Sequence, residues 1–233
     1  MEDQVNQIDI RYQKYYANKN SLKVYPTEFV VRTFLASYPG LAFLRPKFGD
    51  RVLDVGFGDG RNTVFLCDLG LNVSGIEIAQ GIVDQARNRL MKLGHSADLR
   101  VGRNSRIPFD DDYFDCILSC HCCYYCDEGE TLADNLTEYA RVLRSGGYLV
   151  ASVADKASYI FNNAEELSDG SMRIQNDPYG NRMGYRLFGF SRSKDIKDYF
   201  SLFFENFSIG HADNDFYGLE ERVFWVVCQK QGS

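Results

Sequence analysis

The sequence predicts one α/β domain in which helices cover both faces of a mostly parallel β-sheet. Over the first two thirds of the chain, short apolar runs alternate with stretches of helical periodicity, as in proteins built on a parallel sheet. A cluster of glycines follows the first of these apolar runs directly. The final run, RVFWVVC at residues 222–228, is almost wholly apolar, which is typical of a strand covered on both faces.

Composition supports a globular protein and excludes several functions. The 233 residues suit one domain over 1–233, and 45% hydrophobic with 25% charged residues are ordinary values for such a chain. A net charge of -6 gives no positive field for a phosphate backbone, so we expect no nucleic-acid partner. The chain starts without an apolar leader and has no run of about 18 apolar residues, so we expect a cytoplasmic protein without a membrane partner. A monomer or a homodimer is expected.

Residues 1–45 are expected to form an N-terminal lid that includes a helix. The segment is polar and aromatic, with tyrosines at positions 12, 15, 16 and 25. A helix is predicted from about Thr27, because Phe29, Val30 and Phe34 fall on one face. It should end before the Pro39-Gly40 pair.

The segment that follows contains four predicted strands. The first strand runs into the glycine cluster and then into a helix that stops at Gly70, and the helix after the second strand stops at Gly94. This order makes a βαβ unit, which is the building block of parallel sheets. We place the four strands at 51–55, 72–78, about 98–101 and 114–120.

The remaining elements are a helix, a fifth strand, an insertion and a closing hairpin. Asp127 and Glu130 have the spacing of a capping box, which predicts a helix that begins there and ends at Gly146-Gly147. The fifth strand is expected at 148–153. Residues 155–190 lack a long period of either kind and should form a cap insertion on the substrate side. A helix at 193–203 and strands near 204–212 and 221–229 complete the chain.

The glycine cluster has the features of a nucleoside site. Gly56, Gly58 and Gly60 follow a buried strand and precede a helix, where missing Cβ atoms allow a sharp turn and let a ligand approach the backbone. Glu77 ends the next strand, and a carboxylate there can accept hydrogen bonds from both hydroxyls of a ribose. Arg61 stands where a dinucleotide motif has Gly or Ala, so a pyrophosphate is not required.

These motifs resemble the class I S-adenosylmethionine (SAM)-dependent methyltransferases. VLDVGFGDG resembles the family's D-x-G-x-G-x-G signature, with Asp54 as its acidic residue, and similarity to its adenine loop, fourth strand and fifth strand extends over residues 51–152. The resemblance implies a Rossmann-like, seven-stranded, mostly parallel sheet with an antiparallel C-terminal hairpin. It also implies a transferase of the class EC 2.1.1.-, with SAM as cofactor and S-adenosylhomocysteine (SAH) as product.

The resemblance also assigns cofactor-binding residues. The turn should cradle the methionine end of SAM, Asp54 should meet its amino group directly or through water, and Cys120 with His121 should lie beside the sulfonium. GRNSRIPF at 102–109 is similar to the adenine loop of the quinone-biosynthesis-type subgroup, except that Arg103 replaces an aspartate. Asn104 can supply the acceptor for the base instead, or the arginine can stack on it. The full expected set is Asp54, Gly56, Gly58, Gly60, Glu77, Ile78, Arg103, Asn104, Ser105, Cys120, His121, Arg32, Tyr25 and Tyr15.

The loop after the fourth strand is expected to bind the methyl acceptor. His121, Tyr124 and Tyr125 follow the carboxyl end of a parallel strand, where ligands lie in open α/β sheets. Histidine can take a proton near neutrality and tyrosine can donate a hydrogen bond, so these three are the candidate catalytic residues. A zinc site is not expected, because the run of cysteines and histidine at 120–126 has no second pair of ligands elsewhere.

The cap insertion contributes two further expectations. Arg173, Arg182 and Arg186 leave room for an anionic group on the acceptor. The segment 176–179, NDPY, is similar to a motif of amino-group methyltransferases but lacks one proline, and a β-turn explains it better.

The predicted function is methyl transfer from SAM to an O or N atom, less favourably a C atom, of a small-molecule acceptor. One alternative is an NAD(P)-dependent oxidoreductase, which shares the strand, the glycine turn and the acidic residue. Arg61 and the apolar C-terminal strand pair argue against it. Another is a methyltransferase-like protein that binds SAM without catalysis, and nothing in the sequence excludes this.

Overall fold

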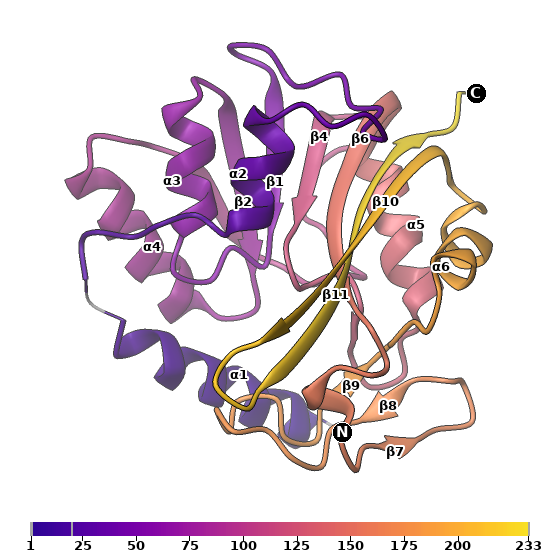
Figure 1. Ribbon diagram of the computed structural model, residues 1–233. Helices are drawn as coiled ribbons and strands as arrows, with labels where there is room; N and C mark the ends of the chain where they lie inside the picture. Colours follow the sequence, from indigo (N-terminus) through magenta and orange to yellow (C-terminus); the bar gives the residue numbers. More distant parts are fainter. Residues whose placement is uncertain (1, 20, 233) are drawn as a thin grey trace.

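The computed structural model describes residues 2–19 and 21–232, without the side chains of residues 2–6. Over these residues the chain forms a seven-stranded sheet in the order β10-β11-β6-β4-β1-β2-β3 (Figure 1). The first five of its strands in the sequence are parallel, whereas β11 is antiparallel to both of its neighbours. This confirms the predicted fold class. The strands are β1 (Arg51–Val55), β2 (Asn72–Glu77), β3 (Asp98–Val101), β4 (Phe114–Ser119), β6 (Leu143–Ala154), β10 (Phe204–Asp215) and β11 (Glu220–Lys230).

Helices cover both faces of this sheet because successive side chains of a strand point to opposite sides. In β1, Val52 packs in one cluster with residues of α2 (Glu28–Leu35) and α3 (Arg61–Asp68), and the cluster under α4 (Gln80–Lys92) adjoins it through Cys67. Leu53, the next residue, packs with residues of α5 (Leu132–Val142) and α6 (Ser193–Phe200). None of the described helices is long and apolar enough to cross a membrane.

A second layer lies beyond one end of the sheet. It consists of α1 (Glu2–Ala17), the 3-10 helix η1 (Tyr159–Phe161) and a small sheet in the order β5-β9-β8-β7. In Figure 1, α1, the small sheet and the turn between β10 and β11 lie together at the lower end of the molecule. The strands of the small sheet are β5 (Tyr125–Cys126), β7 (Glu165–Glu166), β8 (Met172–Arg173) and β9 (Arg186–Leu187).

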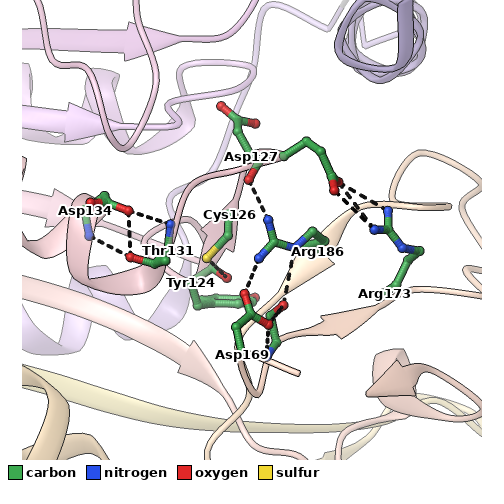
Figure 2. A network of polar contacts seen from close by, with 10 residues as sticks. Tyr124, Cys126, Asp127, Thr131, Asp134, Asp169, Arg173 and Arg186 are labelled. Atoms are coloured by element: carbon green, nitrogen blue, oxygen red, sulfur yellow. Dashed lines mark hydrogen bonds and ion pairs between the residues drawn. The ribbon is translucent and has the colours of Figure 1, made fainter. Parts of the chain in front are cut away.

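The capping box predicted at Asp127 and Glu130 is wrong. Thr131 caps α5: its Oγ1 accepts a hydrogen bond from the Asp134 amide at 3.3 Å, and the Asp134 carboxylate accepts one from the Thr131 amide at 2.7 Å (Figure 2). Asp127 cannot serve as a cap because its carboxylate binds Arg103 and the Tyr185 hydroxyl.

The predicted boundary between α5 and the fifth strand is also wrong. The helix ends at Val142, and β6 begins at Leu143 and continues through Gly146-Gly147. A Cβ on Gly147 would meet two carbonyl oxygens at 2.9 Å. Gly147 therefore lets the strand pass close to its neighbours, while Gly146 has a positive φ of 71°. Neither glycine terminates the helix.

Candidate functional site

A cavity of about 450 Å³ lies at the carboxyl ends of the parallel strands. It is lined by the residues that follow β1, β2, β3 and β4, by the end of β6, and by α1, the segment 158–185 and the turn before β11. Its size falls within the range of roughly 300–1,000 Å³ that is usual for small-molecule sites. Adjacent strands β1 and β4 lie where the strand order reverses, the position at which open α/β sheets bind ligands.

The glycine turn after β1 borders this cavity: Gly56 lines it, whereas Gly58 and Gly60 do not. Gly56, Gly58 and Gly60 have positive φ angles of 68°, 55° and 77°, which side chains with a Cβ rarely adopt. The sulfur of Cys122 lies 2.5 Å from the position that a Cβ on Gly56 would take, and the Tyr16 hydroxyl occupies the corresponding position at Gly58. A larger residue at Gly56 would therefore overlap Cys122, and one at Gly58 would displace Tyr16 of α1.

Glu77 ends β2 with its carboxylate directed at this turn. Its Oε1 accepts a hydrogen bond from the Gly58 amide at 3.1 Å, and its Oε2 accepts one from the Ile78 amide at 2.8 Å. Burial raises the pKa of Glu77 to about 7, and the two amides only partly offset this. A carboxylate beside a bare glycine turn suits the two hydroxyls of a ribose.

Asp54 supports the turn without lining the cavity. It is buried, and its Oδ2 accepts a hydrogen bond from the Thr63 hydroxyl at 2.7 Å. Burial raises its pKa to about 7. The predicted direct contact with the ligand's amino group has no support here, because the cavity is lined by its neighbours Val55 and Gly56.

In the loop after β3, the side chains of Arg103 and Asn104 bind other groups of the protein. Arg103 lies 2.6 Å from Asp9 of α1 and 3.1 Å from Asp127. Asn104 accepts a hydrogen bond from the Tyr139 hydroxyl at 2.8 Å and donates to the carbonyls of Cys122 and Tyr125. Both side chains line the cavity. However, the proposed use of the Asn104 side chain as the acceptor for adenine is not favoured, because its oxygen already accepts from Tyr139.

The loop after β4 brings the candidate catalytic residues together. His121, Tyr124 and Tyr125 all line the cavity, and the rings of the two tyrosines lie 5.0 Å apart. His121 has a positive φ of 55° and donates its amide to Ser152 Oγ at 2.8 Å, a strained conformation of the kind found at functional positions. Burial lowers the pKa of His121, which favours the neutral ring.

Sequence comparisons agree with this geometry. Residues 53–151 match the family model described as a methyltransferase domain. A demethylmenaquinone methyltransferase of Tropheryma whipplei is 36% identical over 102 residues, which are 44% of this chain and 41% of that protein. Residues 53–151, which are less than half of the chain, are similar to the class I SAM-dependent methyltransferases. The aligned segment thus spans less than half the length of this curated relative.

Solved methyltransferase structures share the fold. A SAM-dependent methyltransferase of Methanosarcina mazei superimposes with a TM-score of 0.65 and 20% identity, covering 85% of this chain and 100% of that chain. The 1,6-didemethyltoxoflavin-N1-methyltransferase of Burkholderia thailandensis was solved with 1,6-didemethyltoxoflavin and SAH. It superimposes with a TM-score of 0.57 and 14% identity, covering 79% of this chain and 72% of that chain. At these identities the likeness establishes the methyltransferase fold and nothing finer.

Several residues predicted to bind the methyltransferase cofactor lie elsewhere. Tyr25 is 73% exposed. The Arg32 guanidinium binds the Glu28 carboxylate at 2.7 Å on the outer face of α2 and donates to the Tyr38 hydroxyl. Neither residue lines the cavity, and neither does Ser105. Tyr15, Ile78 and Cys120 do line it. From the segment before α2, Thr27 lines the cavity in place of Tyr25, and its amide donates to Asn62 at 2.9 Å.

One face of α1 was not recognised in the sequence. Tyr12, Tyr15 and Tyr16 line the cavity at positions i, i+3 and i+4 of the helix, and Lys19, two residues after its end, lines it too. This is the spacing of one helical face, so the periodicity could have identified both the helix and the residues that it presents.

Two of the three arginines of the cap do not face the acceptor. Arg186 pairs with Asp169 and donates to the Asp127 carbonyl at 2.9 Å, while Arg173 lies 3.4 Å from Glu128 (Figure 2). The expectation that these two leave room for an anion is wrong, because acidic partners already hold them. Arg182 does line the cavity. Among the described residues, no group of three or more His, Cys, Asp and Glu side chains is placed to hold a metal ion.

Proposed function

We propose that the chain transfers a methyl group from SAM to an O or N atom, less favourably a C atom, of a small-molecule acceptor and releases SAH. The supporting observation is the pairing of Glu77 with the glycine turn: its carboxylate accepts a hydrogen bond from the Gly58 amide, and Glu77 and Gly56 line one cavity. The fit to SAM rests on this carboxylate at the cavity wall, since it can accept hydrogen bonds from the two hydroxyls of a ribose. A cytoplasmic location and a monomeric or dimeric state remain predictions.

The cavity divides naturally between cofactor and acceptor. Glu77 and Ile78 would hold the ribose, the glycine turn and Tyr15 the methionine end, and Gly102 and Arg103 the base. Residues 1–45 would form a lid, and residues 155–190 a cap over the acceptor. When bound, SAM supplies a methyl group on a sulfonium, which an acceptor nucleophile takes by in-line displacement.

The protein's own contribution is orientation, exclusion of water and proton transfer. Holding two reactants in line can lower a barrier by about 7 to 11 kcal/mol. Because burial lowers the pKa of His121, its ring is available as a base. Burial raises the pKa values of Tyr124 and Tyr125, so these phenols remain protonated and orient the acceptor as donors.

Calorimetry with SAM, SAH and NAD tests the assignment. We expect the wild type to bind SAM and SAH with micromolar affinity and not to bind NAD. Glu77→Ala should weaken SAH binding by at least about tenfold, or 1.4 kcal/mol. Glu205→Ala removes an exposed carboxylate of β10 and should leave binding unchanged. Tight NAD binding, or full SAH affinity in Glu77→Ala, would contradict the proposal.

A SAM-binding protein without catalytic activity is the remaining alternative. It would pass the same calorimetric test, since the family match concerns the domain that binds the cofactor. Methyl transfer from labelled SAM to a panel of small metabolites distinguishes the two. SAH formation that depends on an added metabolite supports an enzyme.

A further inference from the structure

The end of the cavity remote from the glycine turn contains an unpaired carboxylate. Glu221 of β11 lines the cavity and is partly buried. Among the contacts of the described residues, its carboxylate has no ion pair and no hydrogen bond. Its negative charge acts on three residues of the cavity: it adds to the effect of burial in raising the pKa values of Tyr124 and Tyr159, and it opposes the lowering of the His121 pKa by burial. The carboxylate therefore lies near the residues expected to hold the acceptor.

The cation at this end is already neutralised. Arg182 binds Asp177 through two hydrogen bonds, from Nη2 to Oδ1 at 3.0 Å and from Nε to Oδ2 at 3.2 Å. The Asp177 side chain is completely buried, with 0% exposed. Arg182 also donates to the Tyr159 hydroxyl at 3.0 Å. Since Asp177 offsets Arg182, the charge of Glu221 is left over and this end of the cavity is negative.

A buried hydrogen-bond acceptor lies at the same end. Asn181 is only 8% exposed and lines the cavity. Its Oδ1 has no hydrogen-bond partner within the part of the chain that the structure describes. Buried polar atoms without a partner are rare in native proteins and ask for a ligand or a water. A donor on the bound acceptor would satisfy this oxygen.

The walls around these groups are aromatic. Tyr124, Tyr159, Tyr179 and Phe216 all contribute to this end of the cavity. Aromatic faces attract cations, and combinations of such rings with a carboxylate recognise ammonium groups. An anionic acceptor would instead meet an unpaired carboxylate and electron-rich rings.

We propose that this end of the cavity binds an amine, with Glu221 as its counter-ion and Asn181 Oδ1 as an acceptor for its N–H. The inference rests on the proposed function, because the bound amine is then the methyl acceptor: its ammonium form loses a proton to the neutral His121 ring, and the freed lone pair displaces SAH from the methyl carbon. It replaces the expectation of an anionic acceptor. It also selects nitrogen over oxygen among the atoms that the cavity could present for methylation.

Calorimetry on the full chain saturated with SAH tests this with matched probes. Tyramine, 4-hydroxyphenylethanol and 4-hydroxyphenylacetate share a ring and differ in an amino, hydroxyl or carboxyl group, and a second series replaces the ring with an alkyl chain. In at least one of the two series, the amine should bind at least about tenfold more tightly than the alcohol and the acid. A charge-assisted hydrogen bond contributes a free energy of this size. If no amine exceeds its counterparts, the proposal is wrong.

Variants locate the effect. Glu221→Gln and Asn181→Ala should each weaken amine binding, by at least about tenfold for Glu221→Gln. Glu220→Gln, at the exposed neighbouring position whose carboxylate pairs with Arg222, should not. Equal amine affinity in Glu221→Gln and the wild type would overturn the assignment.

SAH binding by the same proteins separates this proposal from the previous one. Normal SAH affinity with no preference for amines refutes the amine site alone. If the wild type does not bind SAH, the methyltransferase function is refuted.

Discussion

The two halves of the cavity are built differently. The centre of the half proposed for the cofactor is the turn at Gly56–Gly60 with Glu77, which lie close together in the chain and at the ends of adjacent strands, while Tyr15 and Arg103 join it from α1 and from the loop after β3. The acceptor half is assembled from four separate segments at 121–125, 154–160, 179–185 and 216–223. A nucleoside site can thus be encoded locally, whereas the acceptor site depends on tertiary packing and on buried ionic contacts.

Removing the buried ion pair of the acceptor half should have the largest effect. Arg182→Leu leaves the Asp177 carboxylate buried without its partner, which should lower the free energy of unfolding by about 3–5 kcal/mol. Arg192→Leu breaks an exposed pair with Asp195 and should change it by less than about 1 kcal/mol. Urea unfolding measures both. Equal stabilities would show that the acceptor half does not depend on this pair.

A methyl group on the turn should be the most damaging change in the cofactor half. Gly58→Ala combines an unfavourable positive φ with an overlap with Tyr16. Together they should lower the free energy of unfolding by about 2–5 kcal/mol. Gly94→Ala is the matched control, because Gly94 has a φ of 79° and open space around it. In this control only the positive φ is unfavourable, so the free energy of unfolding should fall by only about 1–2 kcal/mol. SAH affinity should fall in Gly58→Ala and persist in Gly94→Ala. Similar losses of stability and of SAH affinity in both variants would show that the overlap with Tyr16 has no effect.

Arg103 connects the two halves, and its removal should have an intermediate effect. It pairs with Asp9 of α1 and with Asp127, whose carboxylate also binds the Tyr185 hydroxyl at 2.7 Å. Arg103→Leu should lower stability by about 1–3 kcal/mol and increase amide hydrogen exchange in α1. Arg87→Leu, which breaks an exposed pair with Asp84, provides the comparison. Unchanged exchange in α1 would mean that Arg103 does not hold the helix.

The smallest expected effect is a pH dependence of the cofactor half. In the proposed function the ribose hydroxyls would donate to ionised Glu77, so SAH binding should lower the pKa of that residue from its value of about 7 in the free protein. Linkage then requires SAH affinity to rise with pH and level off above 7. The ionised fraction is about 0.1 at pH 6 and about 0.9 at pH 8, so the gain is at most about ninefold.

Glu77→Gln is the control for this pH dependence. It should flatten the profile, although Asp54 titrates over the same range, since Asp54 does not line the cavity. An equally steep profile in the variant would assign the dependence to another group.

The contrast between the halves also explains what the sequence could predict. The strand order and the pairing of Glu77 with the glycine turn follow from short-range patterns, because a βαβ unit places consecutive strand ends at one edge. Asp127 was misassigned as a helix cap because its partners Arg103 and Tyr185 are distant in the chain. The ion pair between Arg186 and Asp169 could not be predicted from the sequence either, since no local pattern indicates which charged side chains pair. Glu221 was overlooked because β11 reads as an ordinary apolar strand.

The hairpin of β10 and β11 has a consequence for the divergence of this fold. Glu221 and Val223 lie two residues apart on one side of β11 and both line the cavity. Lengthening each arm by two residues would preserve this alternation and extend the tip by about 7 Å, whereas a one-residue insertion would exchange the inward and outward side chains. Natural insertions of even length in this hairpin can therefore reshape the choice of substrate while the glycine turn stays untouched.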